Sequence, residues 1–332
     1  MAPWGRHVDS PEARGYHAPM SRTAPASYVV VCLNPVIQRT LVYARLDKGE
    51  VNRTADHRVD AAGKGVDCAR VLAQAGKKAV NLTQLGGPTR DWFLDLCEQD
   101  GVALRWVESG SEIRFCTTVL DLADGSATEL VEEARPVEEG TGERVLVAFR
   151  ELLPSCSTVM LSGTKASGFS GDLMPRLAAL AGEAGKRLFL DIKGSDLLGS
   201  LVHRPLVVKP NLEELLQTYA PEKAAALRSG EGYDEGEIRA FLSSVGAEYR
   251  EKYGAWLVVT RGAMPALFWD GRRLGECPAR RIKALNPIGS GDAFNVGLAI
   301  ALEEGASIAE AVAEGTRYGA LNAERLKPGS IL

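Results

Sequence analysis

The sequence predicts an α/β protein with a three-layer α/β/α core, a mostly parallel sheet and a small antiparallel β lid. Short runs rich in β-branched residues alternate with longer amphipathic segments along most of the chain. This order is typical of buried parallel strands joined by helices that cover both faces of a sheet. Two stretches, at 37–60 and 111–133, instead alternate polar and apolar residues, as half-exposed antiparallel strands do.

The expected elements follow one another in a regular order. Strands are expected at 27–33, 79–85, 157–162, 187–192, 205–208 and 256–260. Helices are expected at 65–75, 88–100, 142–153, 170–184, 211–218, 235–252, 291–304 and 307–326. The sequence Ala123-Asp-Gly-Ser126 is a hairpin signal inside the second alternating stretch. The two alternating stretches are therefore expected to form a small sheet that acts as a lid.

Composition and charge exclude several classes of protein. The 332 residues carry a net charge of −4, which gives no general attraction to nucleic acid or to an anionic membrane. The six cysteines include no CxxC pair, so we expect neither a zinc site nor a disulfide scaffold, and we expect a cytoplasmic location. No apolar run is long enough to span a membrane.

The chain divides into an N-terminal extension and one folded domain. Residues 1–26 contain four prolines and no apolar stretch, and we expect them to be a flexible extension. Residues 27–332 carry all of the strand and helix signals. They are expected to form a single domain, with the lid strands at about 37–60 and 111–133.

The first candidate site opens an apolar helix near the end of the chain. Gly289, Ser290 and Gly291 would present successive backbone N–H groups at the helix N-terminus, where the helix dipole favours an anion such as phosphate. Asp292 is either an ordinary acidic residue at a helix start or a base that accepts a proton beside a transferring phosphoryl group. The chain has no Walker sequence, and the segment lacks the third glycine of a dinucleotide site.

A second candidate site lies where a strand runs into a helix, in the sequence Lys209-Pro-Asn-Leu-Glu-Glu214. Asn211 and Glu214 have the spacing of a capping box. The carboxylate of Glu214 could also organise Mg²⁺ through water from the end of the strand. The two interpretations are compatible.

A third candidate site is the start of an amphipathic helix, where Gly63 and Gly65 flank Lys64. One interpretation is a tight turn with a solvated lysine. The other is a cation that binds sugar hydroxyls or a phosphate. The flanking glycines would give its backbone the conformational freedom this requires.

Together these segments resemble the ribokinase-like (PfkB) carbohydrate kinases, and most closely the branch of 1-phosphofructokinases and tagatose-6-phosphate kinases. The resemblance runs in order from about residue 28 to the end of the chain. It implies a ribokinase-like kinase domain that uses ATP and Mg²⁺. It also implies a sugar or sugar phosphate as acceptor, and a homodimer formed through the β lid.

The resemblance assigns a role to each matching residue. Asp292 would be the catalytic base, and Gly289, Ser290 and Gly291 would form the anion hole. The residues that would bind ATP and Mg²⁺ are Lys209, Asn211, Glu214 (holding the metal through water), Thr260 and Gly262. The residues that would bind the acceptor are Gln38, Gly63, Lys64, Asp67 and Arg114, of which Arg114 would hold the phosphate of a phosphosugar.

Departures from the family pattern concentrate on the sugar side. Gln38 replaces an aspartate and Asp67 replaces an asparagine, while Lys165 and Cys116 are also unusual at their positions. Lys165 is expected near the binding crevice. The leading expectation is an ATP-dependent kinase of a fructose 1-phosphate, fructose 6-phosphate or tagatose 6-phosphate class of substrate. The alternatives are a kinase of an unphosphorylated sugar or nucleoside, and a non-catalytic sugar-phosphate sensor.

Overall fold

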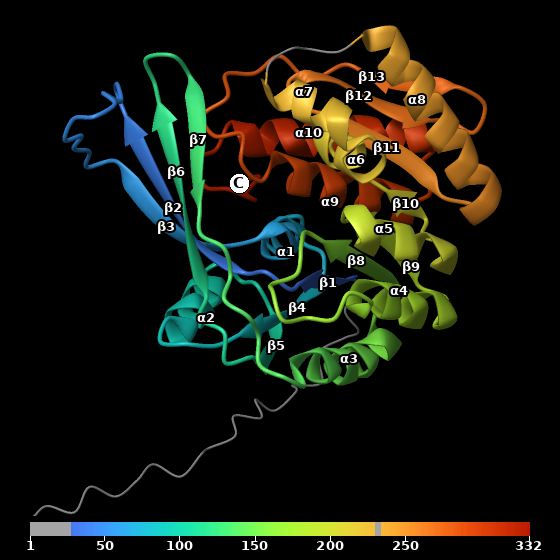
Figure 1. Ribbon diagram of the computed structural model, residues 1–332, viewed down its shortest axis with the longest axis horizontal. Helices are drawn as coiled ribbons and strands as arrows, with labels where there is room; N and C mark the ends of the chain where they lie inside the picture. Colours follow the sequence, from blue (N-terminus) through green and yellow to red (C-terminus); the bar gives the residue numbers. More distant parts are fainter. Residues whose placement is uncertain (1–27, 230–233) are drawn as a thin grey trace, which may run out of the picture.

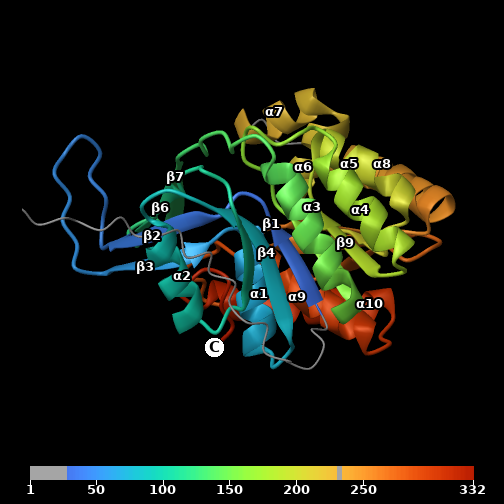
Figure 2. The same ribbon diagram turned by 90° about the horizontal axis from the view of Figure 1, so that it is seen from below.

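The structure, a computed structural model, describes residues 28–229 and 234–332. The expected extension at 1–26 lies outside the described residues. In the described part a nine-stranded sheet lies between two layers of helices, and a separate four-stranded sheet stands beside it (Figures 1 and 2). The predicted three-layer α/β/α fold with a small lid sheet is confirmed.

The main sheet has the strand order β13-β12-β11-β10-β9-β8-β1-β4-β5. Its strands are β1 (Tyr28–Cys32), β4 (Ala79–Leu85), β5 (Leu104–Glu108), β8 (Thr158–Ser162), β9 (Arg187–Asp191), β10 (Val207–Val208), β11 (Trp256–Arg261), β12 (Met264–Trp269) and β13 (Leu274–Cys277). Neighbouring strands from β11 to β5 run parallel. At the other edge β12 and β13 pair antiparallel.

Helices cover both faces of this sheet. They are α1 (Lys64–Gln74), α2 (Arg90–Gln99), α3 (Thr141–Leu152), α4 (Leu173–Glu183), α5 (Gly194–Ser200), α6 (Leu212–Tyr219), α7 (Pro221–Ser229), α8 (Glu235–Glu248), α9 (Ser290–Glu303) and α10 (Ile308–Ala323). Figure 2 shows α3, α4, α5 and α6 on one face of the sheet and α1, α9 and α10 on the other. Among the described helices, none combines the length and apolar character needed to cross a membrane.

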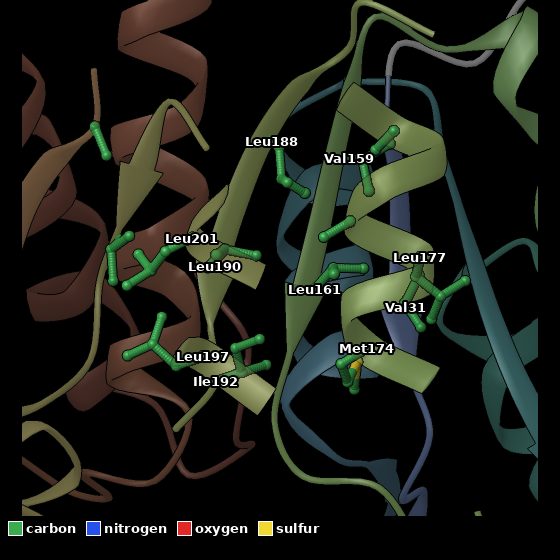
Figure 3. Close-up of a cluster of buried hydrophobic side chains, with 14 of the residues drawn as sticks. Val31, Val159, Leu161, Met174, Leu177, Leu188, Leu190, Ile192, Leu197 and Leu201 are labelled. Carbon is green, nitrogen blue, oxygen red and sulfur yellow. The ribbon is translucent and has the colours of Figure 1, made fainter. Parts of the chain in front are cut away.

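The strands are apolar on both sides because each face packs against helices. Along β1, Val29 and Val31 belong to one buried cluster, whereas Tyr28 and Val30 belong to the other. In the first cluster Val31 lies near Leu177 of α4 (Figure 3). This double burial explains the continuous β-branched runs from which the parallel strands were predicted.

The lid is the four-stranded sheet of β2 (Val36–Tyr43), β3 (His57–Ala62), β6 (Arg114–Asp121) and β7 (Ser126–Val131), in the order β3-β2-β6-β7. Its outer pairs are antiparallel, as predicted, but the central pair of β2 and β6 is parallel. Alternating polar and apolar side chains reveal which face of a strand is buried and give no information on its direction relative to a neighbour. The parallel central pair therefore differs from the prediction.

Several elements were not predicted. No clear sequence signal indicates β5, the β12–β13 hairpin, α5 or α7. The predicted helix at 235–252 is α-helical only as far as Glu248 and continues as a π-helical turn, Tyr249–Tyr253. Gly254, with φ +73°, ends that turn.

Polar residues gather where the parallel strands end. Because β1, β8, β9 and β10 are parallel, their carboxyl ends meet at one edge of the sheet. Asn34, Thr164, Asp191 and Lys209 stand at or just beyond those ends. Ligands bind at this edge in open α/β sheets. The lid begins beside the same edge, because β2 follows β1 after a short connection (Figure 1).

Candidate active site

A cavity of about 160 Å³ opens at the carboxyl edge of the sheet. Residues from the ends of β1, β8 and β9 line it, together with Gly63 and Lys64 at the start of α1, Glu214 of α6 and Arg114 of the lid. Segments far apart in the chain therefore meet at one small cavity. Four of the predicted site residues line it.

Lys64 connects the carboxylates of this cavity. Its Nζ lies 2.7 Å from Glu214 Oε1 and 3.3 Å from Asp191 Oδ1. Burial alone would lower the pKa of Lys64, but Asp191, Glu214 and the nearby Asp292 raise it above its ordinary value. Lys64 is thus a fixed cation and not the solvated turn residue of the alternative interpretation.

Asp191 is a central carboxylate to which the sequence analysis gave no role. It ends β9 and is almost completely buried. Its Oδ2 lies 3.4 Å from the Nζ of Lys209, a residue that is also buried. A polar residue at the end of a strongly apolar strand was the signal that could have identified it. Lys64 and Lys209 thus share one carboxylate.

Asp292 lies beside these charges. It sits in the first turn of α9 and its residue surface is 7% exposed. Burial is the main cause that raises the pKa of Asp292 well above its ordinary value; Asp67 adds to the rise, whereas Lys64 and Lys209 oppose it. A carboxylate with these neighbours is suited to accept a proton.

The Gly289–Gly291 loop forms the N-terminus of α9, as expected. Gly289 has φ +81° and is the N-cap. The N–H of Ser290 donates to Pro287 O (3.2 Å) and that of Asp292 to Gly289 O (3.1 Å). The free donors of this loop are therefore the N–H groups of Gly289 and Gly291, which have no carbonyl partner in the described structure. The expected run of successive donors is interrupted at Ser290.

Asn322 and residues 329–330 hold this loop in place. Asn322 of α10 donates to Ile288 O (2.8 Å) and Ser290 Oγ (3.0 Å), and it accepts from the N–H of Ser330 (2.9 Å). A Cβ on Gly289 would lie 2.2 Å from the N of Gly329. The loop thus has little freedom to move. No site role is predicted for Asn322 from the sequence.

The capping box at the start of α6 is present. Asn211 Oδ1 accepts from the Glu214 N–H (2.8 Å), and Glu214 Oε2 accepts from the Asn211 N–H (3.1 Å). Burial would raise the pKa of Glu214, but Lys64 and these hydrogen bonds hold it below its ordinary value. Thr260 pairs with Asn211 through an isolated parallel bridge. Gly262 lies in the turn after β11, with φ +62°.

Two residues that line the cavity each have a buried polar atom without a hydrogen-bond partner among the described residues. Asn34 donates through Nδ2 to Thr164 Oγ1 (3.1 Å), but its buried Oδ1 has no partner. Arg114 donates through Nη1 to Glu132 O (3.1 Å), but its buried Nε has no partner. A buried unpaired acceptor and a buried unpaired donor are unfavourable in the free protein. They are therefore suited to a ligand that offers both a hydroxyl and an anion.

The structure does not bring Gln38 or Asp67 to this cavity. Gln38 is buried in the lid and donates to Thr118 Oγ1 (2.7 Å). Asp67 is buried against Arg70, with 2.7 Å between Oδ1 and Nη1, and Gly329 packs directly over it. Burial is the main cause that raises the pKa of Asp67 to about 6, although Arg70 opposes it.

The other two unusual residues also lie outside the cavity lining. Lys165 does not enter the crevice as expected, because its Nζ pairs with both carboxylate oxygens of Asp196 (2.5 and 2.6 Å). Cys116 is buried at the base of the lid against Val36 and Ala62. Besides Lys64, the lysine that lines the cavity is Lys193, directly after β9.

A larger cavity of about 360 Å³ lies between α10 and the segment that precedes the Gly289–Gly291 loop in the chain. The segment 280–282 and the α10 residues Arg317 and Ala320 contribute to its lining. It contains none of the predicted site residues. Between this segment and the loop, the Leu285 N–H donates to Ala323 O at the end of α10 (2.7 Å).

Comparison with known proteins identifies this arrangement. The sequence model of the pfkB family carbohydrate kinases matches residues 29–331. The chain belongs to this family. It is accordingly a phosphotransferase that uses an alcohol group as acceptor.

Solved structures share the fold of this pfkB family kinase at low sequence identity. A possible 1-phosphofructokinase from Thermotoga maritima is 18% identical, with a TM-score of 0.78 over 91% of this chain and 93% of that one. Phosphofructokinase-2 from Escherichia coli in complex with fructose-6-phosphate is 22% identical, with a TM-score of 0.74 over 92% and 96%. The tetrameric inhibited form of the latter enzyme is 21% identical, with a TM-score of 0.74 over 90% and 94%. These similarities establish the fold of the kinase.

Proposed function

We propose that this carbohydrate kinase transfers the γ-phosphoryl group of ATP to a hydroxyl of a sugar phosphate. The observation that carries the proposal is Arg114, which lines a cavity together with Lys64 and Glu214 and whose buried Nε has no partner among the described residues. An arginine with a free donor is suited to a phosphate that the acceptor already bears. The solved phosphofructokinase-2 structure with fructose-6-phosphate supports the same class of acceptor.

Asp292 is the proposed catalytic base. Its carboxylate would accept the proton of the acceptor hydroxyl as that oxygen attacks the γ-phosphorus. The raised pKa of Asp292 makes its ionised form a stronger proton acceptor. Lys64 and Lys209 oppose this rise, which favours the ionised form that a base requires.

The Gly289–Gly291 loop and Lys209 are the proposed phosphoryl-binding groups. The N–H groups of Gly289 and Gly291 have no carbonyl partner, and a Cβ on Gly291 would lie 4.0 Å from Lys209 Nζ. Donors fixed before the reaction stabilise negative charge as it develops on the transferring phosphoryl oxygens. Asn322 holds the loop in this position through Ile288 and Ser290.

The donor set of the site fits Mg²⁺, which we propose as the cofactor. Among the described residues no group of three or more His, Cys, Asp or Glu side chains is placed to hold a metal. Mg²⁺ in kinases needs fewer, because it uses one or two carboxylates, waters and the substrate phosphates. Glu214 would hold it through water, since both of its oxygens already accept hydrogen bonds. Bound there, the metal would neutralise phosphate charge.

The nucleotide base is proposed to occupy the cavity of about 360 Å³. If the phosphates lie at the Gly289–Gly291 loop, the base must extend past one side of that loop. Residues 280–282, which line this cavity, precede the loop in the chain. Arg317 and the segment 280–282 supply guanidinium groups that can stack on an aromatic base. Thr260 and Gly262 remain the proposed contacts on the strand side.

The lid is proposed to form a homodimer, and the protein to act in the cytoplasm. β7 is an edge strand of the lid, and Leu130 and Val131 on it are 58% and 53% exposed. Exposed apolar edge strands are rarely left uncovered. Sedimentation velocity would give a dimer; a monomer at all concentrations would contradict the dimer proposal. All six cysteines are free, as a reducing compartment allows.

A coupled assay of ATP consumption tests the proposed activity. The acceptors are fructose 1-phosphate, fructose 6-phosphate and tagatose 6-phosphate, with free fructose and a nucleoside as the alternatives. We expect turnover with at least one phosphorylated acceptor and much less with free fructose. Turnover restricted to unphosphorylated acceptors would favour the second kinase class, and no turnover with any acceptor would favour a sensor.

A further inference from the structure

The acceptor cavity contains more positive charge than its carboxylates balance. Three cationic side chains line it, those of Lys64, Arg114 and Lys193. Two carboxylates, Asp191 and Glu214, also line it, and both pair with Lys64. What the cavity can bind therefore depends on whether the other two cations, Arg114 and Lys193, have carboxylate partners of their own.

Arg114 makes only a neutral hydrogen bond in the described ranges. Its hydrogen bond is to the backbone carbonyl of Glu132, and it forms no ion pair within the part of the chain that the structure covers. Glu129 on β7 feels its charge, since Arg114 lowers the pKa that burial raises at Glu129, but the two do not meet as an ion pair. The guanidinium thus keeps its full charge for a ligand.

Lys193, like Arg114, is held by a hydrogen bond to a neutral group. It follows β9 directly, and its Nζ donates to the neutral amide oxygen of Gln217 on α6 (2.8 Å). No carboxylate in the described ranges lies within ion-pair distance of it. Lys165, in contrast, is balanced by Asp196 at 2.5 Å. A lysine held by one neutral hydrogen bond can turn its flexible stem toward an anion at little cost.

We propose that Lys193 is a second phosphate-binding residue of the acceptor site, so that Arg114 from the lid and Lys193 from the core hold one phosphate monoester between them. This inference rests on the proposed function, which it deepens. A phosphate monoester carries a charge of about −1.5 to −2 near pH 7. Two uncompensated cations match one such group.

The positions of the two residues fit a single phosphate. Arg114 pairs in register with Val36, just after β1, and Lys193 follows β9, with β8 between the two strands. Strands lie about 4.8 Å apart, so the two strand ends are about 10 Å apart. Long side chains can close on one phosphate across that distance. Thr164, which follows β8, also lines the cavity.

This arrangement also links acceptor choice to lid position. A phosphate held by Arg114 and Lys193 joins the lid to the core, whereas an unphosphorylated sugar leaves the two cations facing each other without an anion. Binding energy from the phosphate would thus favour a closed lid that excludes water from the transferring group.

The test compares Lys193→Met and Lys193→Arg with Arg114→Met and with a control, Lys223→Met. Lys223 is an exposed lysine that does not line the cavity, and its Nζ lies 2.8 Å from Glu237 Oε2. For the phosphorylated acceptor that the wild-type protein uses, we expect Lys193→Met to raise KM by about 10- to 100-fold, as Arg114→Met does. Lys193→Arg should recover most of the loss. KM for ATP should be unchanged in all of these variants. The control variant should keep the wild-type KM for both substrates.

Binding of inorganic phosphate, measured by calorimetry without ATP, gives a readout that does not depend on activity. We expect the Lys193→Met variant to bind phosphate at least about 10-fold more weakly than the wild type, with an unchanged melting temperature. Equal phosphate binding by the two proteins would overturn the inference, as would a rise in KM for ATP equal to that for the acceptor.

The two proposals fail in different ways. If the wild-type protein phosphorylates only unphosphorylated acceptors, the proposed function is wrong. If it phosphorylates a sugar phosphate and Lys193→Met leaves KM for that acceptor unchanged, the proposed function stands and the role of Lys193 is wrong.

Discussion

Lys64 Nζ lies 2.7 Å from Glu214 Oε1, and this ion pair joins the first residue of α1 to the first turn of α6, 150 residues further along the chain. Both helices begin at the carboxyl edge of the sheet. The pair thus ties the acceptor side of the site to the side proposed for ATP and Mg²⁺. Loss of either partner would leave the other charge partly buried and unbalanced.

Replacement of Lys64 should impair both stability and turnover. Lys64→Met leaves Asp191 and Glu214 without their shared cation, so we expect kcat to fall by about 10²- to 10³-fold and the protein to become less stable. Steady-state kinetics and chemical denaturation measure the two effects. Lys77→Met, at an exposed pair with Glu304, is the control and should change stability by less than about 1 kcal/mol. Equal effects of the two variants would contradict the role of Lys64.

Removal of the Asp67 carboxylate should shift the pH dependence of turnover. Asp67 raises the pKa of Asp292, so Asp67→Asn should lower that pKa. A base with a lower pKa is ionised at a lower pH. The acidic limb of the kcat profile should therefore move to lower pH. Asp95→Asn, on the exposed side of α2, should leave the limb in place. A limb that moves upward or stays fixed in Asp67→Asn would contradict the coupling.

Contact between the C-terminal segment and α1 should make Gly329 intolerant of a side chain. A Cβ there would lie 2.4 Å from Asp67 Cβ and 2.7 Å from its Cα, and Gly329 has φ +58°. Gly101 has φ +67° with open space around it, so Gly101→Ala measures the backbone strain alone. We expect Gly329→Ala to lower the free energy of unfolding by about 1–3 kcal/mol more than Gly101→Ala. Equal losses would show that the segment yields freely.

Obstruction of the larger cavity should affect ATP and not the acceptor. Ala320 of α10 lines that cavity, so Ala320→Trp should raise KM for ATP by about tenfold or more. Inorganic phosphate binding at the acceptor site should be unchanged, because the acceptor cavity has a different lining. Unaltered KM for ATP would place the nucleotide base elsewhere.

Local patterns predicted the parts of the site that depend on local structure. The capping box of Asn211 and Glu214 spans four residues, and the helix start at Gly289 is a short motif, so both could be recognised from sequence. The doubly buried strands could be recognised for the same reason, since each is a continuous apolar run. The fold class and the loop at α9 therefore followed from the chain alone.

Long-range pairings could not be derived in this way. Lys165 and Lys193 both follow strand ends, and which of them lines the cavity depends on Asp196, which lies 31 residues from Lys165 and balances it. The bond from Asn322 to Ser290 also spans 32 residues. No local pattern specifies such partners, because they are set by how the strands and helices pack.

Transfer of labelled phosphate from γ-labelled ATP to a sugar phosphate, compared between the wild-type protein and Asp292→Asn, tests the central claim most directly. Asparagine keeps the shape of the side chain but cannot accept the hydroxyl proton. We expect the wild-type protein to label the acceptor, and Asp292→Asn to do so about 10²- to 10⁴-fold more slowly while binding ATP equally well. Equal rates of labelling by the two proteins would contradict the assignment of Asp292 as the base.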